Sequence, residues 1–225
     1  MLKLALPQLK VSTILHTTNY FSLMSDTKPC SFAKDSITYL APTWSDLNQL
    51  AFETCERIKQ QDKKFDRVVA LAKGGWPMTR SIVDFLGIDE VASIGIKFYA
   101  GINERYQKPQ IYQDLPVSVT GENILLFDDV ADSGGSLIFT IDYLLKQGAK
   151  TVVTACLFYK PHSQLKPDFY GAKTSAWIIF PFEQFEAMKI LAKNWTEQKV
   201  SQSEIIQRFK KLNFSDQFIQ SALKL

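Results

Sequence analysis

The 225-residue sequence has no long hydrophobic run, no cluster of cysteines and no strong excess of charge of either sign. No apolar stretch approaches the roughly 18 residues that a membrane span needs, so we expect no membrane association. The net charge of +3 is small, and interspersed acidic and basic residues leave no patch that indicates nucleic-acid binding. Cys30, Cys55 and Cys156 are too widely spaced for a disulfide framework or a zinc cluster. A reducing, cytoplasmic compartment is therefore the expected location.

Histidine and N-terminal acidic residues are also scarce. His16 and His162 belong to no pattern that indicates catalysis, so we expect no catalytic role for either. Residues 1–25 contain no Asp or Glu and are rich in Ser and Thr, which loosely resembles a transit peptide. They also contain no Arg, and Met24 makes an over-extended start an equal alternative. We treat residues 1–40 as an N-terminal extension.

The most informative stretch runs from Ile124 to Ser136. Four apolar residues, typical of a buried strand, are followed by Asp128, Asp129 and Asp132 and then by a turn rich in Ser and Gly. A helical apolar pattern starts directly after this turn. Free backbone N–H groups at a helix N-terminus bind phosphate, and carboxylates suit sugar hydroxyls, Mg²⁺ or a proton. The stretch therefore predicts a site for a phosphorylated sugar and its metal.

Short apolar runs alternate with amphipathic segments along most of the chain. Helices are expected from Thr43, which with Asp46 resembles a capping box, from Pro77 to Gly87, and up to Gln147. Strands are expected at residues 68–72, 91–99, 124–127, 151–159 and 176–180. This alternation predicts an α/β fold with a mainly parallel central sheet and helices on both faces, whose ligands collect at the carboxyl ends of the strands.

Two polar segments and the C-terminal part complete the prediction. Residues 101–116 are expected to form a long loop, and residues 163–171 a polar loop of unassigned role. Val200, Ser201, Glu204 and Ile205 predict a capping box with a hydrophobic staple, and Ser215 opens a further helix. We therefore expect a domain over 41–185 and C-terminal helices over 186–225 that pack on it.

The stretch of residues 125–136 resembles the phosphoribosyl-diphosphate signature of type I phosphoribosyltransferases, in which two acids at a strand end precede a small, hydroxylic turn. The resemblance implies that the acids hold the ribose hydroxyls, directly or through Mg²⁺, and that the turn wraps the 5′-phosphate. The residues given these roles are Asp128, Asp129, Asp132, Ser133, Gly134, Gly135 and Ser136. Gly135 stands where many relatives carry a side chain, which is harmless if backbone N–H groups bind.

Two further segments resemble the same family. Lys73-Gly74-Gly75 follows a strand and is similar to its diphosphate loop, which often has a cis peptide before the Lys, here Ala72–Lys73. Lys160, Trp177, Ile178 and Glu183 resemble the base-binding residues of its 6-oxopurine branch. The resemblance implies that Lys160 donates to the exocyclic O6, Trp177 stacks on the base, the Ile178 backbone meets the base edge, and Glu183 lies near the 2-substituent or a second Mg²⁺.

The resemblance implies an enzyme of purine salvage. It would use Mg²⁺, held by Asp129 and Glu183, and join a 6-oxopurine (guanine, hypoxanthine or xanthine) to phosphoribosyl diphosphate, with Asp132 handling the proton at purine N7. Arg105 and Tyr106 suggest phosphate contacts in the long loop. The expected partners are these small molecules and further copies of the chain in a dimer or tetramer.

Alternatives remain open at this point. The acidic stretch is also compatible with an ordinary strand–helix turn, Trp177 with a core residue, and Glu183 with a carboxylate at a helix start. A non-catalytic phosphoribosyl-diphosphate sensor would share the fold. Transfer to adenine or orotate is a further alternative, and Lys160 opposes adenine.

Overall fold

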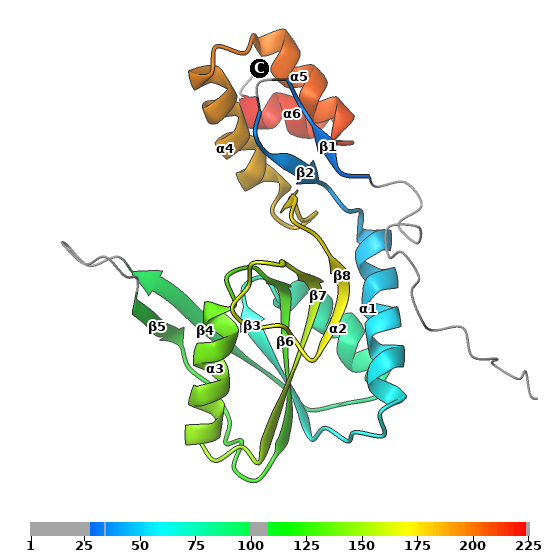
Figure 1. Ribbon diagram of the computed structural model, residues 1–225, viewed down its shortest axis with the longest axis vertical. Coiled ribbons are helices and arrows are strands. Elements are labelled where there is room, and N and C mark those ends of the chain that lie inside the picture. The colour runs from blue at the N-terminus through cyan, green and yellow to red at the C-terminus, as the bar shows by residue number, and fades with distance from the viewer. Residues whose placement is uncertain (1–27, 34, 100–107, 224–225) are drawn as a thin grey trace, which may run out of the picture.

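The computed structural model describes residues 28–33, 35–99 and 108–223, and its centre is a six-stranded sheet (Figure 1). The strand order is β5-β4-β3-β6-β7-β8, and every neighbouring pair is parallel except β4 and β5. The strands are β3 (Arg67–Ala72), β4 (Val91–Tyr99), β5 (Lys108–Gln113), β6 (Asn123–Ala131), β7 (Thr151–Tyr159) and β8 (Phe169–Lys173). The predicted fold class, a mainly parallel sheet in an α/β protein with C-terminal helices, is confirmed.

Helices cover both faces of this sheet. The helices α1 (Trp44–Lys59) and α2 (Trp76–Leu86) share a core with one face, in which Leu47 and Ile82 pack with Leu125. The helix α3 (Gly135–Lys146) covers the other face, where Leu137 packs with Leu126. Alternate β6 side chains enter the two cores, which explains the continuous apolar run.

Local signals set the ends of these helices as the sequence predicted. The Thr43 side chain accepts a hydrogen bond from the backbone N–H of Asp46, whose carboxylate accepts from the backbone N–H of Thr43, so the capping box is complete. Pro77 lies in the first turn of α2, and Gly87 ends this helix in a left-handed conformation with φ of 66°.

A second group of elements, which we call the cap, lies beyond the carboxyl edge of the sheet (Figure 1). It consists of β1 (Cys30–Ser31), β2 (Thr38–Leu40), β9 (Trp177–Ile178), α4 (Gln184–Glu197), α5 (Gln202–Lys211) and α6 (Asp216–Leu223). The three strands form a separate sheet in which β2 pairs in parallel with β9. Trp195, Phe209 and Tyr39 are among the buried side chains of its own core. Among the described residues, no helix is long and apolar enough to cross a membrane.

The structure corrects three predicted elements. The strand predicted at 176–180 is limited to Trp177–Ile178 and belongs to the cap, so it is not the last strand of the central sheet. That strand is β8, which covers part of the predicted polar loop 163–171. The sequence did not indicate this strand because it contains Gly171, a residue that is rare in strands. Packing requires glycine there, since a Cβ atom would stand 2.6 Å from Leu157 O. The predicted loop 101–116 contains β5, an edge strand whose solvent exposure explains its missing apolar pattern.

One predicted motif in the cap is correct only in part. Ser201 caps α5 by accepting from the backbone N–H of Glu204. The Glu204 carboxylate, however, pairs with Arg208 at 2.6 Å and does not reach back to the cap residue. The division into 1–40, 41–185 and 186–225 stays a proposal, to which the described residues add that β1 and β2 pack with the C-terminal helices.

Candidate active site

The candidate site lies where β3, β6 and β7 end, at the edge of the sheet that faces the cap (Figure 1). These strands are neighbours and parallel, so the segments that follow them emerge side by side. The sequence motifs at Lys73, Asp128 and Lys160 follow or end these three strands. The structure therefore brings them to one edge, as the sequence predicted.

The paired acids occupy the last part of β6. Asp129 is only 8% exposed, and its carboxylate accepts a hydrogen bond of 2.8 Å from the Val130 backbone N–H. The Asp128 carboxylate accepts from the Asp129 backbone N–H at 2.9 Å. Burial, with the neighbouring Asp129 charge, raises the pKa of Asp128 well above its usual value, and burial raises that of Asp129 to about 6. The pair holds negative charge that a cation or hydroxyl donors would stabilise.

The Lys73-Gly74-Gly75 turn lies directly against these acids. A Cβ atom placed on Gly74 would stand 2.5 Å from the Asp129 carboxylate oxygens, and one on Gly75 would stand 2.8 Å from Phe127 O. A larger residue would therefore force the Asp129 carboxylate to shift at position 74 and the backbone to shift at position 75. The Ala72–Lys73 peptide is cis, as the family resemblance implied. The turn thus presents backbone to the same space that the Asp129 carboxylate faces.

The residues from Ser133 to Ser136 form the start of α3. Gly134 adopts a left-handed conformation with φ of 80°, and no described side chain caps the helix. The Ser133 hydroxyl accepts from the Gly135 backbone N–H at 3.3 Å. A helix N-terminus of this kind offers backbone donors and a favourable dipole to an anion. The geometry suits the predicted phosphate cradle.

Lys160 is buried at the end of β7, with only 6% of its surface exposed. Its backbone N–H donates to Ala131 O at 3.0 Å, and its Nζ donates to Ala176 O at 2.5 Å. Burial lowers the pKa of its ammonium group, whereas the Asp132 charge opposes this change. A buried ammonium held by a single carbonyl has further donors to offer a carbonyl of a ligand.

Trp177 and Ile178 form β9, which pairs with β2 in register with Tyr39 and Leu40. The half-buried Trp177 ring leans on Tyr39, with ring centroids 5.8 Å apart, and Ile178 is buried. Trp177 therefore has one side supported by the cap. This position is compatible with stacking on a ligand and with packing at the edge of the cap core.

Glu183 lies at the first turn of α4, with its side chain exposed to solvent. Partial burial of its carboxyl group is the main cause that raises the pKa of Glu183 to about 7, and the charge of Asp129 is the second cause. The two acids thus influence each other although they belong to different parts of the fold. Mg²⁺ is usually bound by one or two carboxylates together with substrate phosphates, so Asp129 and Glu183 fit such an ion once a diphosphate is present. Among the described residues, no group of three or more His, Cys, Asp or Glu could hold a metal without help.

Asp132 has a partner that sequence reasoning missed. His162 Nε2 lies 2.8 Å from Asp132 Oδ1, and both side chains are exposed by more than half. The only available signal was its position, two residues after Lys160. Arg105 and Tyr106, which the sequence suggested as phosphate contacts, lie outside the described residues.

The fold and the site together define an α/β protein in which paired acids, a glycine turn and a helix N-terminus lie at the carboxyl edge of the sheet. Residues 44–185, more than half of the chain, match the phosphoribosyl transferase domain. The chain belongs to this family and is a phosphoribosyltransferase, as the sequence motifs predicted.

Individual relatives agree with this assignment. The chain is 25% identical to the xanthine-guanine phosphoribosyltransferase of Gluconobacter oxydans, over 66% of this chain and 86% of that protein. The crystal structure of a purine phosphoribosyltransferase from Pyrococcus horikoshii is similar with a TM-score of 0.58 and 29% identity, over 64% of this chain and 93% of that one. A hypothetical protein from Neisseria gonorrhoeae with bound ppGpp is similar with a TM-score of 0.60 and 25% identity, over 66% and 91% of the two chains.

Proposed function

We propose that the protein is a Mg²⁺-dependent purine phosphoribosyltransferase of purine salvage. It forms a nucleoside 5′-monophosphate and diphosphate from a 6-oxopurine (guanine, hypoxanthine or xanthine) and 5-phosphoribosyl 1-diphosphate. The observation that carries the proposal is the close fit of Gly74 against Asp129, at the edge that also holds Lys160. A Cβ atom placed on Gly74 would stand 2.5 Å from the Asp129 carboxylate. This fit supports the proposal because the segments assigned to the diphosphate, the ribose and the base all follow or end neighbouring strands.

The sugar and its phosphates are assigned to the part of the site on β3, β6 and α3. Backbone N–H groups at the start of α3 receive the 5′-phosphate, and the ribose hydroxyls donate to the buried acids. The turn at Gly74 leaves backbone free to approach the diphosphate. The residues with these roles are Lys73, Gly74, Asp128, Asp129, Asp132, Ser133, Gly134, Gly135 and Ser136.

The base is assigned to the space between β7 and the cap. Lys160 Nζ, already held by Ala176 O, donates to the O6 atom of a 6-oxopurine. A 6-amino group offers only donors there and is rejected, because two donors would face each other. Trp177 stacks on the ring, the Ile178 backbone meets its edge, and Glu183 faces the 2-substituent.

The reaction replaces diphosphate at the anomeric carbon by purine N9, through a state that resembles an oxocarbenium ion. The protein aligns N9 with the sugar and excludes water, and Asp132 takes the proton from N7 as N9 attacks. Asp129 and Glu183 would hold Mg²⁺, which would supply positive charge to stabilise the diphosphate leaving group.

A second candidate is a regulator on the same fold that binds phosphoribosyl diphosphate without turnover. The combination of Asp132, buried Lys160 and Trp177 favours the enzyme, because a sensor of the sugar diphosphate needs none of the base-binding groups. The lysine likewise disfavours adenine as the acceptor. We also propose a cytoplasmic location and a dimer or tetramer of identical chains, with large exposed apolar side chains such as Phe52 and Trp76 available for contacts.

The test is a base-specificity assay with the purified protein, Mg²⁺ and phosphoribosyl diphosphate. We expect turnover of at least one of guanine, hypoxanthine and xanthine, and none of adenine. Tight binding of phosphoribosyl diphosphate without turnover of any of the three bases would instead support the regulator.

The Asp132→Asn variant tests the assigned proton transfer. An amide cannot accept the N7 proton as a carboxylate does, so kcat should fall by about 10²-fold, the lower range for general acid–base catalysis. Binding of phosphoribosyl diphosphate, measured by calorimetry, checks that the sugar site is intact. Unchanged kcat would remove Asp132 from the mechanism.

A further inference from the structure

His162 and Asp132 come from different segments and meet beside the candidate base site. The imidazole Nε2 lies 2.8 Å from Asp132 Oδ1, within hydrogen-bond distance. An ionised carboxylate only accepts, so the hydrogen of this bond is on Nε2 and His162 is the donor. This bond occupies one oxygen of the carboxylate, and within the described part of the chain no residue bonds to Oδ2.

The loop of residues 160–165 is fixed to the phosphate cradle, which places His162 there. The Lys160 backbone N–H donates to Ala131 O and that of Gln164 donates to Ser133 O, each at 3.0 Å, so the loop is tied on either side of Asp132. A Cβ atom on Gly134 would stand 2.6 Å from Ser163 Oγ, which shows how closely the loop packs on the turn. Ser163 Oγ also donates to Leu165 O at 2.9 Å and closes the loop internally.

We propose that His162 is a positioning residue for base transfer, which holds the Asp132 carboxylate so that Oδ2 faces purine N7; this inference rests on the proposed function. In stability terms an exposed pair of this kind contributes little. Its value is in orientation, because a carboxylate with two free torsions would otherwise sample many directions, and correct placement of a reacting group accounts for large factors in rate. Lys160, whose ammonium group is stabilised by the Asp132 charge, belongs to the same loop and meets the base at O6.

The proton and electron pairs of the step balance without a further reactant. The lone pair of N9 forms the bond to the anomeric carbon, and the bond from that carbon to the diphosphate oxygen breaks with its electron pair on the diphosphate. The proton on N7 moves to Asp132 Oδ2. His162 keeps its own hydrogen on Nε2 throughout and serves only to orient the acceptor.

Three variants test the role. His162→Ala removes the donor, His162→Gln retains an N–H donor that can reach the carboxylate, and Lys166→Ala changes an exposed side chain further along the chain that contacts Tyr170. Thermal melting of each variant checks folding. Steady-state kinetics with hypoxanthine give kcat and KM, and calorimetry gives the affinity for phosphoribosyl diphosphate. Binding of 7-deazahypoxanthine, which has a C–H group where hypoxanthine has N7, isolates contacts at that atom.

We expect His162→Ala to lower kcat about tenfold, as loss of one charge-assisted hydrogen bond implies, with unchanged affinity for phosphoribosyl diphosphate. We expect His162→Gln to recover most of this loss and Lys166→Ala to resemble the wild type. Removing His162 should weaken hypoxanthine binding but leave 7-deazahypoxanthine binding unchanged. The inference is overturned if alanine has no effect, if glutamine is as slow as alanine, or if both ligands lose affinity equally. Absence of turnover in the wild type would refute the proposed function itself, which is a distinct outcome.

Discussion

Gly74 is the position at which the site constrains side-chain size most tightly. The Asp129 carboxylate fills the space that a methyl group would need, at 2.5 Å. The carboxylate is itself 8% exposed and held by the Val130 backbone N–H, so it cannot move away without losing that bond. The Asp129 carboxylate can therefore keep its position only while residue 74 is glycine.

Gly74→Ala should accordingly lower kcat/KM by about 10²-fold, because a misplaced acid and a displaced turn both disturb alignment of the sugar diphosphate. Gly87→Ala is the control. Its added methyl meets nothing within 4 Å, and its φ of 66° makes it strained but remote from the site. That variant should lose about 1 kcal/mol of unfolding free energy and keep its activity. Steady-state kinetics measure kcat/KM and urea denaturation measures the unfolding free energy of each variant. A Gly74→Ala enzyme with unchanged kcat/KM would contradict the assigned fit.

At the residue scale the sequence predicted which residues meet at the edge of the sheet better than it predicted their contacts. The acids of β6, the glycine turn and Lys160 could be identified because each follows or ends a predicted strand and has a residue type that suits a ligand site. The partner of Asp132 could not, because His162 is distant in sequence and only the folded 160–165 loop brings it there. The support of Trp177 by Tyr39 was equally hidden, since it depends on pairing between β2 and β9.

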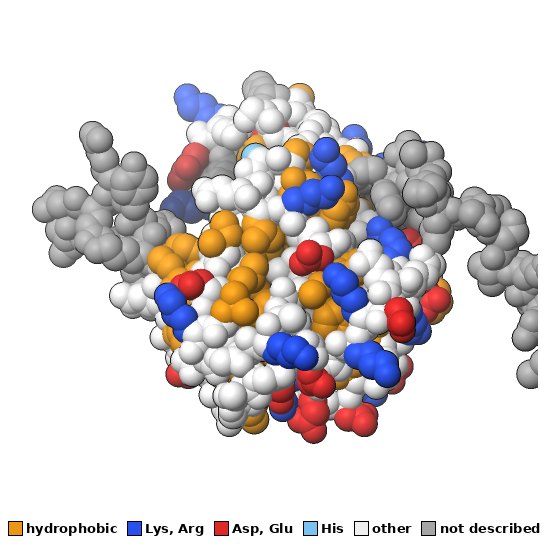
Figure 2. Space-filling model, turned by 60° about the horizontal axis from the view of Figure 1, so that its bottom comes forward, with side chains coloured by type: hydrophobic (Ala, Val, Ile, Leu, Met, Phe, Trp, Pro, Cys, Tyr) orange, Lys and Arg blue, Asp and Glu red, His pale blue; other side chains and the backbone are white. Residues whose placement is uncertain are grey.

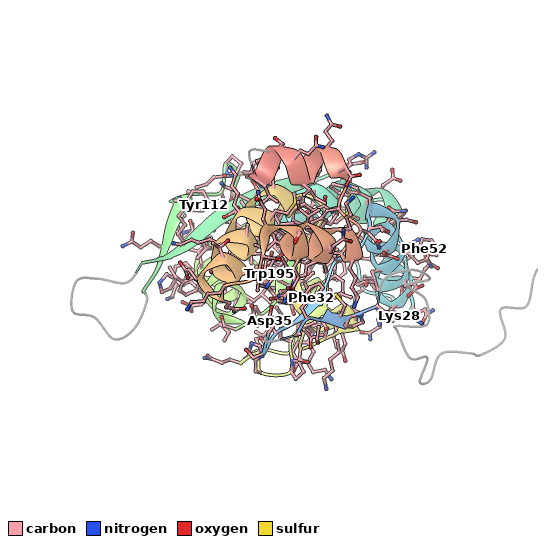
Figure 3. All side chains as sticks on the ribbon, turned by 90° about the horizontal axis from the view of Figure 1, so that it is seen from above. Lys28, Phe32, Asp35, Phe52, Tyr112 and Trp195 are labelled. Atoms are coloured by element: carbon pink, nitrogen blue, oxygen red, sulfur yellow. The ribbon has the colours of Figure 1, made fainter. Side chains whose placement is uncertain are left out.

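The cap is held together by a network between the β1–β2 hairpin and the helices α4 and α5. Asp35 accepts hydrogen bonds from Tyr39 Oη and from Trp195 Nε1, the latter at 2.9 Å. The Arg208 guanidinium lies over the rings of Phe32 and Trp195, 5.1 Å from each ring centroid. Figure 3 shows Phe32, Asp35 and Trp195 close together. Burial opposes ionisation of Asp35, but these hydrogen bonds and Arg208 lower its pKa.

Asp35→Ala should destabilise the protein by about 2–3 kcal/mol, because two donors and the Arg208 charge lose their common partner. Urea denaturation followed by tryptophan fluorescence measures this loss. Ser36→Ala, at the next and exposed position, is the control and should change little. Equal stability of the Asp35 variant would show that the network does not hold the cap. A raised KM for the base in the same variant would indicate that the loss reaches Trp177 through Tyr39.

At the element scale, the success of prediction followed the strength of local signals. Capped helices and buried strands, such as α1 and β7, were found with nearly correct bounds, because their pattern and end residues agree. The strands β5, β8 and β9 were missed or misplaced. One is an exposed edge strand, one contains a glycine required by packing, and one is a two-residue strand whose partner lies far away in sequence.

Three acids of the site with raised pKa values make the stability of the whole molecule depend on pH. Burial raises the pKa of Asp128 well above its usual value, that of Asp129 to about 6 and that of Glu183 to about 7. The folded state therefore binds more protons than the unfolded chain between about pH 4 and pH 7. The favourable contribution of these groups is complete below their ordinary pKa near 4 and is lost as pH rises through the raised values.

Asp128→Asn should thus raise the unfolding free energy of the metal-free protein by about 2 kcal/mol at pH 8 and change it less at pH 5. Asp142→Asn is the control, since that carboxylate is exposed and pairs with Lys146 on the surface of α3. The face of the molecule turned away from the cap shows acidic, basic and apolar side chains near one another (Figure 2). The measurement is urea denaturation at both pH values. An equal gain in unfolding free energy at pH 8 and pH 5 would show that burial does not raise the pKa of Asp128.

The hydrogen bond between Asp35 and Trp195 has a consequence for folding of the chain during synthesis. The two residues are 160 positions apart in the sequence, whereas most contacts of the central sheet join neighbouring units. During synthesis, the β1–β2 hairpin must wait until α4 has left the exit tunnel before its aromatic side chains find their partners. The cap core, which supports Trp177 through Tyr39, is therefore completed after most of the central sheet. A nascent chain can complete most of its sheet while the proposed base site still lacks this support.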